Sequence, residues 1–112
     1  MSCIFCKIIA GEIPANKIYE DEKVLAFYDI DAKAPVHFLI IPKEHITSAA
    51  EITPANSSIV AYIFELAAKL AKELKLENGF RIVNNCGVEG GQTVEHLHFH
   101  VLAGRLLAWP PG

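Results

Sequence analysis

Apolar side chains recur every three or four positions through the middle of the chain, at Ile59, Ile63, Leu66, Leu70 and Leu74. This spacing places them on one face of a helix. Thr53 followed by Pro54 is a typical helix start, and Asn78-Gly79 is a typical stop. The pattern therefore predicts one long helix between these two signals.

Shorter apolar runs before this helix carry the β-branched and aromatic residues typical of strands. Residues 24–28 and 37–41 are two such runs, and the turn-rich stretch 29–35 separates them. This arrangement predicts an antiparallel pair, and Ile18 and Tyr19 predict an additional edge strand.

Strand character returns after the helix at residues 80–84 and 94–102. Residues 4–10, closed by Gly11, predict one or two helical turns against the core. Strands grouped around one long helix, without regular alternation of strand and helix, indicate an α+β fold. The expected architecture is a mostly antiparallel sheet of about five strands with one long and one short helix.

Size and charge narrow the class of protein. A chain of 112 residues fits a single domain spanning residues 1–112, and 52% hydrophobic against 21% charged residues excludes intrinsic disorder. A formal net charge of −3 leaves no basic stripe for a nucleic acid. No apolar run approaches the ~20 residues that span a bilayer, and the first residues do not resemble a secretory signal. We therefore expect a cytoplasmic protein that binds neither nucleic acid nor a membrane.

Three histidines, His96, His98 and His100, alternate with apolar residues near the end of the chain. On a strand their imidazoles would share one face, and Leu97 and Phe99 would face the long helix. One interpretation is a polar outer face that merely contains histidine. Three in a row favour chemistry instead, because neutral imidazole near pH 7 can attack phosphorus, transfer protons or bind a metal.

The segment before these histidines, Gly90-Gly91-Gln92-Thr93, adds a second signal. Glycines expose backbone N–H groups, and the threonine adds a hydroxyl group. Both are typical partners of phosphate oxygens. By itself such a loop is weak evidence, but beside a row of histidines it suggests phosphorus or metal chemistry.

The three cysteines cannot all pair with one another. Cys3 and Cys6 are two residues apart, a spacing typical of metal or redox sites rather than of a disulfide framework. The order of elements is not that of a thioredoxin-like redox protein. Cys86 has no partner at a recognisable spacing, so we expect it to be a buried or half-buried small side chain.

The segment His96-Leu97-His98-Phe99-His100-Val101-Leu102 resembles the signature of the histidine triad (HIT) family, in which histidines alternate with apolar residues. The likeness covers nearly the whole chain and includes residues 8–14, 25–30 and 37–43. The terminal Trp109-Pro110-Pro111-Gly112 is similar to the Hint branch, the purine nucleoside phosphoramidases, more than to the dinucleoside polyphosphate hydrolases or the uridylyltransferases. A HIT-like fold is therefore expected.

The resemblance implies two-step hydrolysis of a nucleoside 5′-phosphoramidate, or of a similar adenylylated compound, without an organic cofactor. His98 would be the nucleophile and form a nucleotidyl-histidine, which divides one difficult step into two easier ones. His100 would contact phosphate oxygens, and His96 and His37 would support the site. Thr93, where the family usually has serine, would act on the leaving group.

The resemblance also implies a purine nucleotide pocket. Asp29 would accept hydrogen bonds from the ribose hydroxyls, although by itself it is typical of a turn after a strand. The phosphate would meet Asn85, Gly91 and Gln92. The residues expected around the base, which would otherwise be interpreted as ordinary core, are Phe5, Ile8, Ile13, Phe27 and Ile30.

Some bacterial members of the family that this chain resembles bind zinc through a cysteine pair and two histidines. Here the residues would be Cys3, Cys6, His45 and His96, which complete a tetrahedral set that two thiolates alone leave short. The alternative is a pair of reduced thiols without a metal. With four protein ligands, such a zinc site would be a closed structural site.

A homodimer is the expected assembly. The hydrophobic share of 52% leaves more apolar surface than one small core hides well. Residues 80–84, if they form an outer strand, expose backbone groups that a second chain would cover. Trp109 would anchor the interface, unless the tail is simply frayed. The resemblance to the Hint branch implies that this tail also reaches the partner's site and shapes the leaving-group pocket. A different class remains open, a nucleotide-binding regulatory or scaffold protein with incidental turnover.

Overall fold

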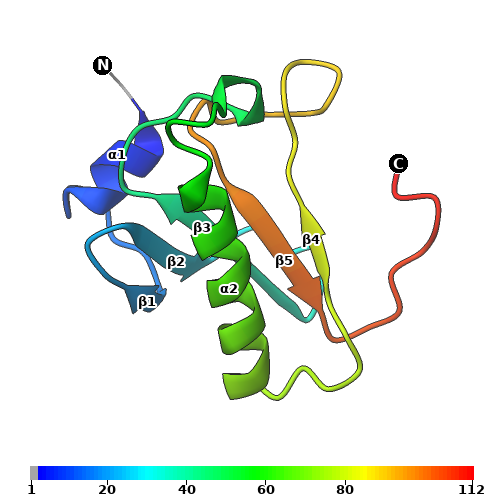
Figure 1. Cartoon of the computed structure of the whole chain (residues 1–112). Helices are drawn as coiled ribbons and strands as arrows, with labels where there is room; N and C mark the ends of the chain where they lie inside the picture. The colour runs from blue at the N-terminus through cyan, green and yellow to red at the C-terminus, as the bar shows by residue number, and fades with distance from the viewer. Residues whose placement is uncertain (1–2) are drawn as a thin grey trace.

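A five-stranded antiparallel sheet in the order β1-β2-β3-β5-β4 forms the centre of the computed structural model, which describes residues 3–112 (Figure 1). The expected α+β architecture, including the short and the long helix, is confirmed. The strands are β1 (Lys17–Glu20), β2 (Val24–Tyr28), β3 (Val36–Pro42), β4 (Arg81–Val83) and β5 (Phe99–Ala103). The helices are α1 (Ile4–Ile9), the short 3₁₀ turn η1 (Ala49–Glu51) and α2 (Ser58–Glu73).

The pairing of β2 with β3 confirms the predicted antiparallel pair, and its register runs from Val24 opposite Pro42 to Tyr28 opposite Phe38. The edge strand β1 pairs with β2. On the other side of β3, His37 lies opposite Leu102 of β5. The strand that carries His37 and the strand that carries His100 are therefore neighbours in the sheet, although they are far apart in the sequence.

The predicted strand over residues 94–102 is wrong in its first half, because β5 begins only at Phe99. Pro42, at the end of β3, has no N–H group to continue the ladder. Its carbonyl instead accepts a hydrogen bond from the His96 ring, with 2.8 Å between Nε2 and O. His96 and His98 consequently precede the strand, and only His100 lies on it.

The long helix α2 also begins later than predicted, at Ser58 rather than at Thr53-Pro54. The amides of Asn56 and Ser57 both bond to the Thr53 carbonyl, which closes a separate turn ahead of the helix. Its end precedes the predicted stop as well, because Lys75 adopts a left-handed conformation with φ 59° and the chain turns there.

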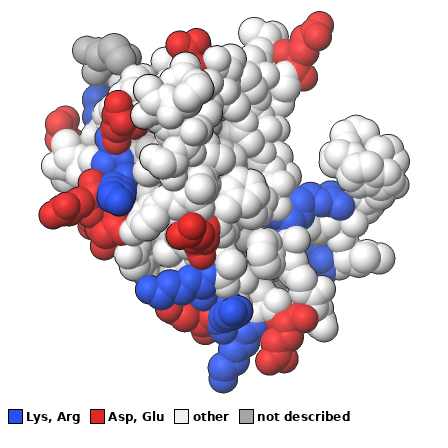
Figure 2. Space-filling model, viewed as in Figure 1, with Lys and Arg blue, Asp and Glu red and all other residues white. Residues whose placement is uncertain are grey.

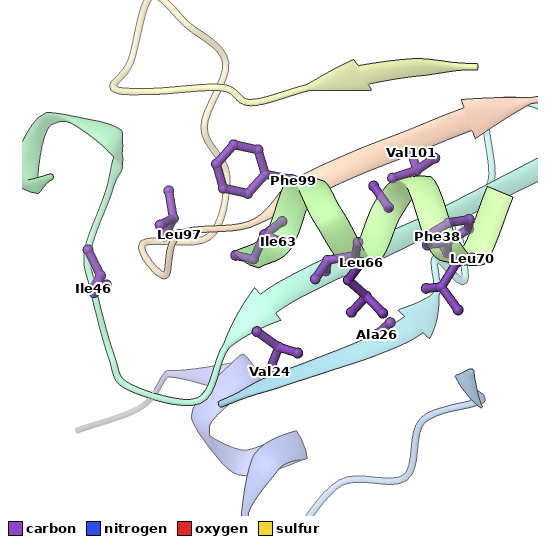
Figure 3. Packing of buried hydrophobic residues seen from close by; sticks show 12 residues of the cluster. Val24, Ala26, Phe38, Ile46, Ile63, Leu66, Leu70, Leu97, Phe99 and Val101 are labelled. Carbon is purple, nitrogen blue, oxygen red and sulfur yellow. The ribbon is translucent and has the colours of Figure 1, made fainter. Parts of the chain in front are cut away.

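Both faces of the sheet are buried, by α2 on one side and α1 on the other. Figure 3 shows Ile63, Leu66 and Leu70 of α2 over the first face. The second face packs Phe5 and Ile8 of α1 against residues of β2 and β3. Two covered faces account for the continuous apolar runs of β2 and β3.

The alternation around the histidines is preserved despite the shorter strand. Leu97, Phe99 and Val101 are buried in the core beneath α2, as expected (Figure 3). The ring of His100 belongs to the opposite face, where it lines a cavity with His98. The helix α2 therefore covers one side of this segment and leaves the other for chemistry.

Surface features complete the picture. Positive and negative side chains are interspersed on the face seen in Figure 2. Among residues 3–112, none of the helices is long and apolar enough to cross a membrane.

The expectation for Cys86 is wrong, because this residue is exposed. It lies in the loop after β4, which turns through Gly87 and Gly91 at the surface and away from either core.

Candidate active site

A cavity of about 590 Å³ opens on the α1 face of the sheet. The helix α1, the connection between β2 and β3, and the segment 93–102 all contribute to its walls. His98 and His100 line it together with His37. Three of the four expected catalytic histidines therefore share one cavity.

The His98 ring is fixed in one tautomer by its own chain. Its Nδ1 lies 2.7 Å from the carbonyl oxygen of His96, and a carbonyl can only accept. Nδ1 therefore carries the proton, and Nε2 of the neutral ring keeps a free electron pair. His98 is only 4% exposed, so this electron pair is sheltered at the cavity wall.

The other two rings form a hydrogen-bonded relay with a defined direction. The amide of Lys33 donates to Nδ1 of His37, 3.0 Å away, so the neutral His37 ring carries its proton on Nε2. That proton is donated to Nδ1 of His100 over 2.9 Å. Nε2 of His100 then carries a proton and is a donor for an anionic ligand.

Burial keeps this relay neutral. Burial, reinforced by the rings of His98 and His37, lowers the pKa of His100 to about 4. Burial also lowers the pKa of His37, although the Asp29 carboxylate opposes the shift. Oδ2 of Asp29 lies 3.4 Å from Nε2 of His37 and 4.0 Å from Nδ1 of His100.

The set Asp29, His37 and His100 has the donor atoms of a metal site, but the relay disfavours one. A metal on Nε2 of His37 would move the ring proton to Nδ1. That proton would then face the Lys33 amide, which is itself a donor. The arrangement suits hydrogen bonding to a ligand better than metal binding.

Apolar side chains form the far wall of the cavity, and they include every residue expected around a base. The rings of Phe5 and Phe27 meet edge to face with centroids 5.7 Å apart. Ile30 differs from the others, because it lines the rim and is fully exposed. A flat apolar ring fits between such walls.

Of the three residues expected around the phosphate, Asn85 lines the cavity, whereas Gly91 and Gln92 do not. Thr93, which is expected at the leaving group, also lines the cavity. The side-chain amide of Gln92 donates to the carbonyls of Thr47 and Val94, and its oxygen accepts from the Gly87 amide. In this structure Gln92 therefore holds the loop together.

Two further contributors to the site carry no signal in the amino-acid sequence. Asn84 donates from its side chain to the His98 carbonyl over 2.9 Å, and the Lys33 contribution comes from its backbone. A backbone donor leaves no trace in residue identity. Asn84 lies in the predicted strand over residues 80–84, and its residue type alone does not mark it as part of a site.

Cys3, Cys6, His45 and His96 meet on the other side of α1. Nδ1 of His96 lies 3.3 Å from Sγ of Cys3 and 3.1 Å from Nδ1 of His45. Sγ of Cys6 lies 3.2 Å from Nδ1 of His45 and 3.6 Å from Nδ1 of His96. A zinc tetrahedron has ligand separations of ~3.3–3.8 Å, given Zn–N near 2.0–2.1 Å and Zn–S near 2.3 Å.

The proton positions also fit a metal. His96 donates its Nε2 proton to the Pro42 carbonyl, which leaves the electron pair on Nδ1 aimed at the cysteines. A carbonyl acceptor behind a histidine ligand is the usual way to orient one. The Cys6 amide donates a hydrogen bond to Sγ of Cys3 over 3.3 Å. These four residues suit a closed metal site.

A family model for the HIT domain matches residues 10–107 of this chain. The chain belongs to the HIT domain family. A crystal structure of a HIT family hydrolase from Legionella pneumophila is 48% identical and superposes with a TM-score of 0.97. The alignment covers 99% of this chain and 100% of that one. The HIT fold and a general hydrolase chemistry are thereby supported.

Two further members of the family are informative. A histidine triad nucleotide-binding protein from Candida albicans is 38% identical, with a TM-score of 0.83 over 97% of this chain and 83% of that one. A 14 kDa zinc-binding protein from Zea mays is 49% identical over 111 residues, which are 97% of this chain and 87% of that protein. One relative of this chain is thus named for nucleotide binding and another for zinc binding.

The C-terminal tail of this HIT domain stands beside β4, away from the sheet (Figure 1). Arg81 donates to the carbonyls of Leu107 and Ala108, and Trp109 is 81% exposed. A groove of about 760 Å³ between the tail and β4 includes Asn85, which also lines the histidine cavity. Trp109 does not line the cavity of the histidines in its own chain.

Proposed function

We propose that this chain hydrolyses purine nucleoside 5′-phosphoramidates, or similar adenylylated compounds, through a nucleotidyl intermediate on His98. The strongest support is the hydrogen bond from Nδ1 of His98 to the His96 carbonyl, because it leaves Nε2 unprotonated at the wall of the cavity. A buried neutral imidazole is a competent nucleophile toward phosphorus.

In the first step, Nε2 of His98 attacks phosphorus and forms a P–N bond, while the bond from phosphorus to the leaving nitrogen breaks. The attacking ring becomes positive, and the His96 carbonyl stabilises it through the Nδ1 proton. In this proposal Thr93, which lines the cavity, donates a proton to the departing nitrogen, and solvent then restores its hydroxyl group.

In the second step, water attacks the same phosphorus and the bond to Nε2 of His98 breaks. The products are a nucleoside monophosphate and a free neutral ring, with one proton released to solvent. In both steps, Nε2 of His100 donates a hydrogen bond to a phosphate oxygen. His37 donates a hydrogen bond to Nδ1 of His100, which keeps the ring proton of His100 on Nε2.

Nucleotide recognition uses the rest of the cavity. The apolar wall around Phe5, Ile8 and Phe27 accepts the base, and Asp29 lies between this wall and the histidines. Its Oδ1 accepts from the Asp31 amide, which orients the carboxylate. A carboxylate has about four acceptor positions, so it retains capacity for two ribose hydroxyls.

Mass spectrometry after brief mixing with adenosine phosphoramidate tests the proposal. The wild-type protein should gain one nucleotidyl group, and peptide mapping should locate it on His98. Cys86→Ala changes an exposed residue that belongs neither to the cavity nor to the Cys/His cluster, and it serves as the control that still forms the adduct. Turnover without any adduct would contradict the nucleotidyl-histidine route.

A nucleotide-binding regulatory protein is the second candidate, because the same cavity would hold a nucleotide without turnover. The two candidates differ in a simple measurement. Tight binding of adenosine monophosphate together with no hydrolysis of adenosine phosphoramidate would favour the regulatory role, whereas rapid turnover supports the enzyme.

We also propose that Cys3, Cys6, His45 and His96 bind one zinc ion. The supporting observations are the ligand separations and the free Nδ1 of His96. Zinc with four protein ligands supplies structural stability and has no open position for a substrate. The chain's own contribution is to connect α1 with the segment after β3 and with the start of the triad.

The proposed assembly is a homodimer formed along β4. This short strand lies at the edge of the sheet, so one side of its backbone is free to pair. Phe64 of α2 is 45% exposed and Phe80 before β4 is 40% exposed, although both are large and apolar. A two-fold partner would cover these groups on both chains at once.

A further inference from the structure

The helix α1 stands between the Cys/His cluster and the cavity. Cys3 is its N-cap residue and Cys6 lies in its first turn, so both face the cluster. Phe5 and Ile8 of the same helix are buried and line the cavity. With six residues, α1 is too short to be stable by itself in water. The position of α1 therefore depends on its contacts with the Cys/His cluster on one side and with the cavity on the other.

Phe5 touches the histidines on both sides of this boundary. Its ring meets the His98 ring edge to face, with centroids 5.1 Å apart and planes at 85°. It meets the His96 ring at 5.9 Å and 73°. Phe5 is therefore the side chain of α1 whose ring contacts both a cluster residue and the proposed nucleophile.

His98 needs such a contact. Its hydrogen bond to the His96 carbonyl fixes which nitrogen carries the proton, but one bond leaves the ring free to tilt about it. A perpendicular aromatic ring at van der Waals distance restricts that tilt. Small errors in the approach of a nucleophile to phosphorus cost rate, because the attack requires alignment.

We propose that Phe5 is a positioning residue that holds the His98 ring in its attacking orientation, and that the Cys/His cluster holds Phe5 there through α1. This inference rests on the proposed role of His98 as nucleophile. A purine that packs on Phe5 would in turn stabilise α1, so zinc and nucleotide should each strengthen binding of the other.

The matched variants are Phe5→Leu and Phe27→Leu. Both residues line the cavity and touch each other, but the recorded ring contacts with histidines belong to Phe5. Both variants should raise KM through lost contact with the base. We expect only Phe5→Leu to lower kcat, by about tenfold at saturating substrate. Equal kcat values in the two variants would overturn the inference.

An independent readout follows the His98 ring itself. In the zinc-loaded wild type, nitrogen NMR should show one His98 tautomer, with Nδ1 protonated. Phe5→Leu should broaden or shift these ring signals, and Phe27→Leu should leave them in place. Phe5→Met removes the ring but supplies a flexible side chain that adapts to irregular gaps, and it replaces Phe5→Leu in every measurement if that variant unfolds. Unchanged His98 signals in the folded Phe5 variant would also overturn the inference.

The link to the metal is measured as zinc affinity against a competing chelator, with and without saturating adenosine monophosphate. The wild type should hold zinc at least threefold more tightly with the nucleotide, and Phe5→Leu should lose this gain. A zinc affinity that is the same with and without adenosine monophosphate would contradict the coupling. Failure to form any His98 adduct in the wild type would instead contradict the proposed function, so the two failures are distinguishable.

Discussion

His37 donates a hydrogen bond from Nε2 to Nδ1 of His100 across two neighbouring strands, over 2.9 Å. The sheet register explains the contact. His37 of β3 lies opposite Leu102 of β5, so His100, two residues earlier, is its diagonal neighbour on the same face. Residues 63 positions apart thus form one unit, which prepares His100 as a donor.

The neutral state of His100 predicts how stability depends on pH. Its pKa is about 4 in the folded chain and near 6.5 when unfolded, so the unfolded chain binds more protons between these values. The contribution to the unfolding free energy is complete above pH 6.5 and is lost as the pH falls toward 4. Denaturant unfolding of wild type and His100→Asn across pH 4–7 measures it. The difference between the two should shrink as the pH falls, and a constant difference would contradict the assignment.

Substitutions of the two cavity histidines should have different effects. His98→Ala should abolish nearly all hydrolysis and change affinity for adenosine monophosphate by less than about tenfold, or about 1.4 kcal/mol, because the nucleophile acts mainly in the transition state. His100→Ala should weaken both rate and binding, since its Nε2 proton contacts phosphate throughout. Steady-state kinetics and calorimetry measure both quantities. Identical behaviour of the two variants would refute the division of roles.

Zinc should be present at close to one equivalent per chain in protein purified from zinc-replete cells, as elemental analysis would show. Removing it with a chelator should lower the melting temperature by several degrees, because α1 loses its connection to His45 and His96. Cys86→Ala is the control, since this exposed cysteine lies outside the cluster. Metal-free protein with three freely titrating thiols would contradict the site.

The carboxylate of Asp21 connects α2 to the turn between β1 and β2. Partial burial raises the pKa of Asp21, but hydrogen bonds to its carboxylate outweigh this effect and lower the pKa to about 2. The donors are the Tyr62 hydroxyl, the Lys23 and Val24 amides and the Tyr19 hydroxyl. We expect Asp21→Ala to cost about 1–3 kcal/mol of unfolding free energy, because several donors lose their acceptor. Thermal or urea unfolding measures it. Glu22→Ala removes an equal charge from the exposed neighbouring position and should cost far less.

Local pattern determined much of this fold in advance. The spacing of Ile63, Leu66 and Leu70 identified the buried face of α2, and the apolar runs identified β2 and β3. Pattern was insufficient where tertiary contacts decide the outcome. The hydrogen bond from His96 to the Pro42 carbonyl, 54 residues away in the chain, belongs to a segment that does not join the strand.

The same limit applies to the candidate site. Histidine spacing identified the residues that would carry the chemistry, but the direction of the relay depends on a backbone amide of Lys33. Gln92 shows the reverse case. Its residue type suits a phosphate contact, yet its amide is occupied by the carbonyls of Thr47 and Val94. Only the folded chain reveals which polar groups are already satisfied.

Assembly provides the remaining prediction, and it depends on surfaces that one chain leaves uncovered. The edge of β4, the exposed ring of Phe64 and the exposed ring of Phe80 favour a two-fold partner. Sedimentation at micromolar concentration should therefore give about twice the 12.3 kDa of one chain. Phe64→Glu places a charge at this surface and should produce monomers, whereas Glu65→Gln on the same helix should not. A monomeric wild type would refute the interface.

The tail extends this prediction from assembly to specificity. Trp109 is 81% exposed within one chain, which is costly for a tryptophan unless a partner covers it. The groove beneath the tail shares Asn85 with the histidine cavity, so a partner's tail at this edge would approach the side where the leaving group departs. Deleting residues 109–112 should therefore change the preference among leaving groups, measured as ratios of kcat/KM for a series of phosphoramidates. Affinity for adenosine monophosphate should change little, because this product has no leaving group. An unaltered preference in a truncated dimer would show that the tail does not contribute to the pocket.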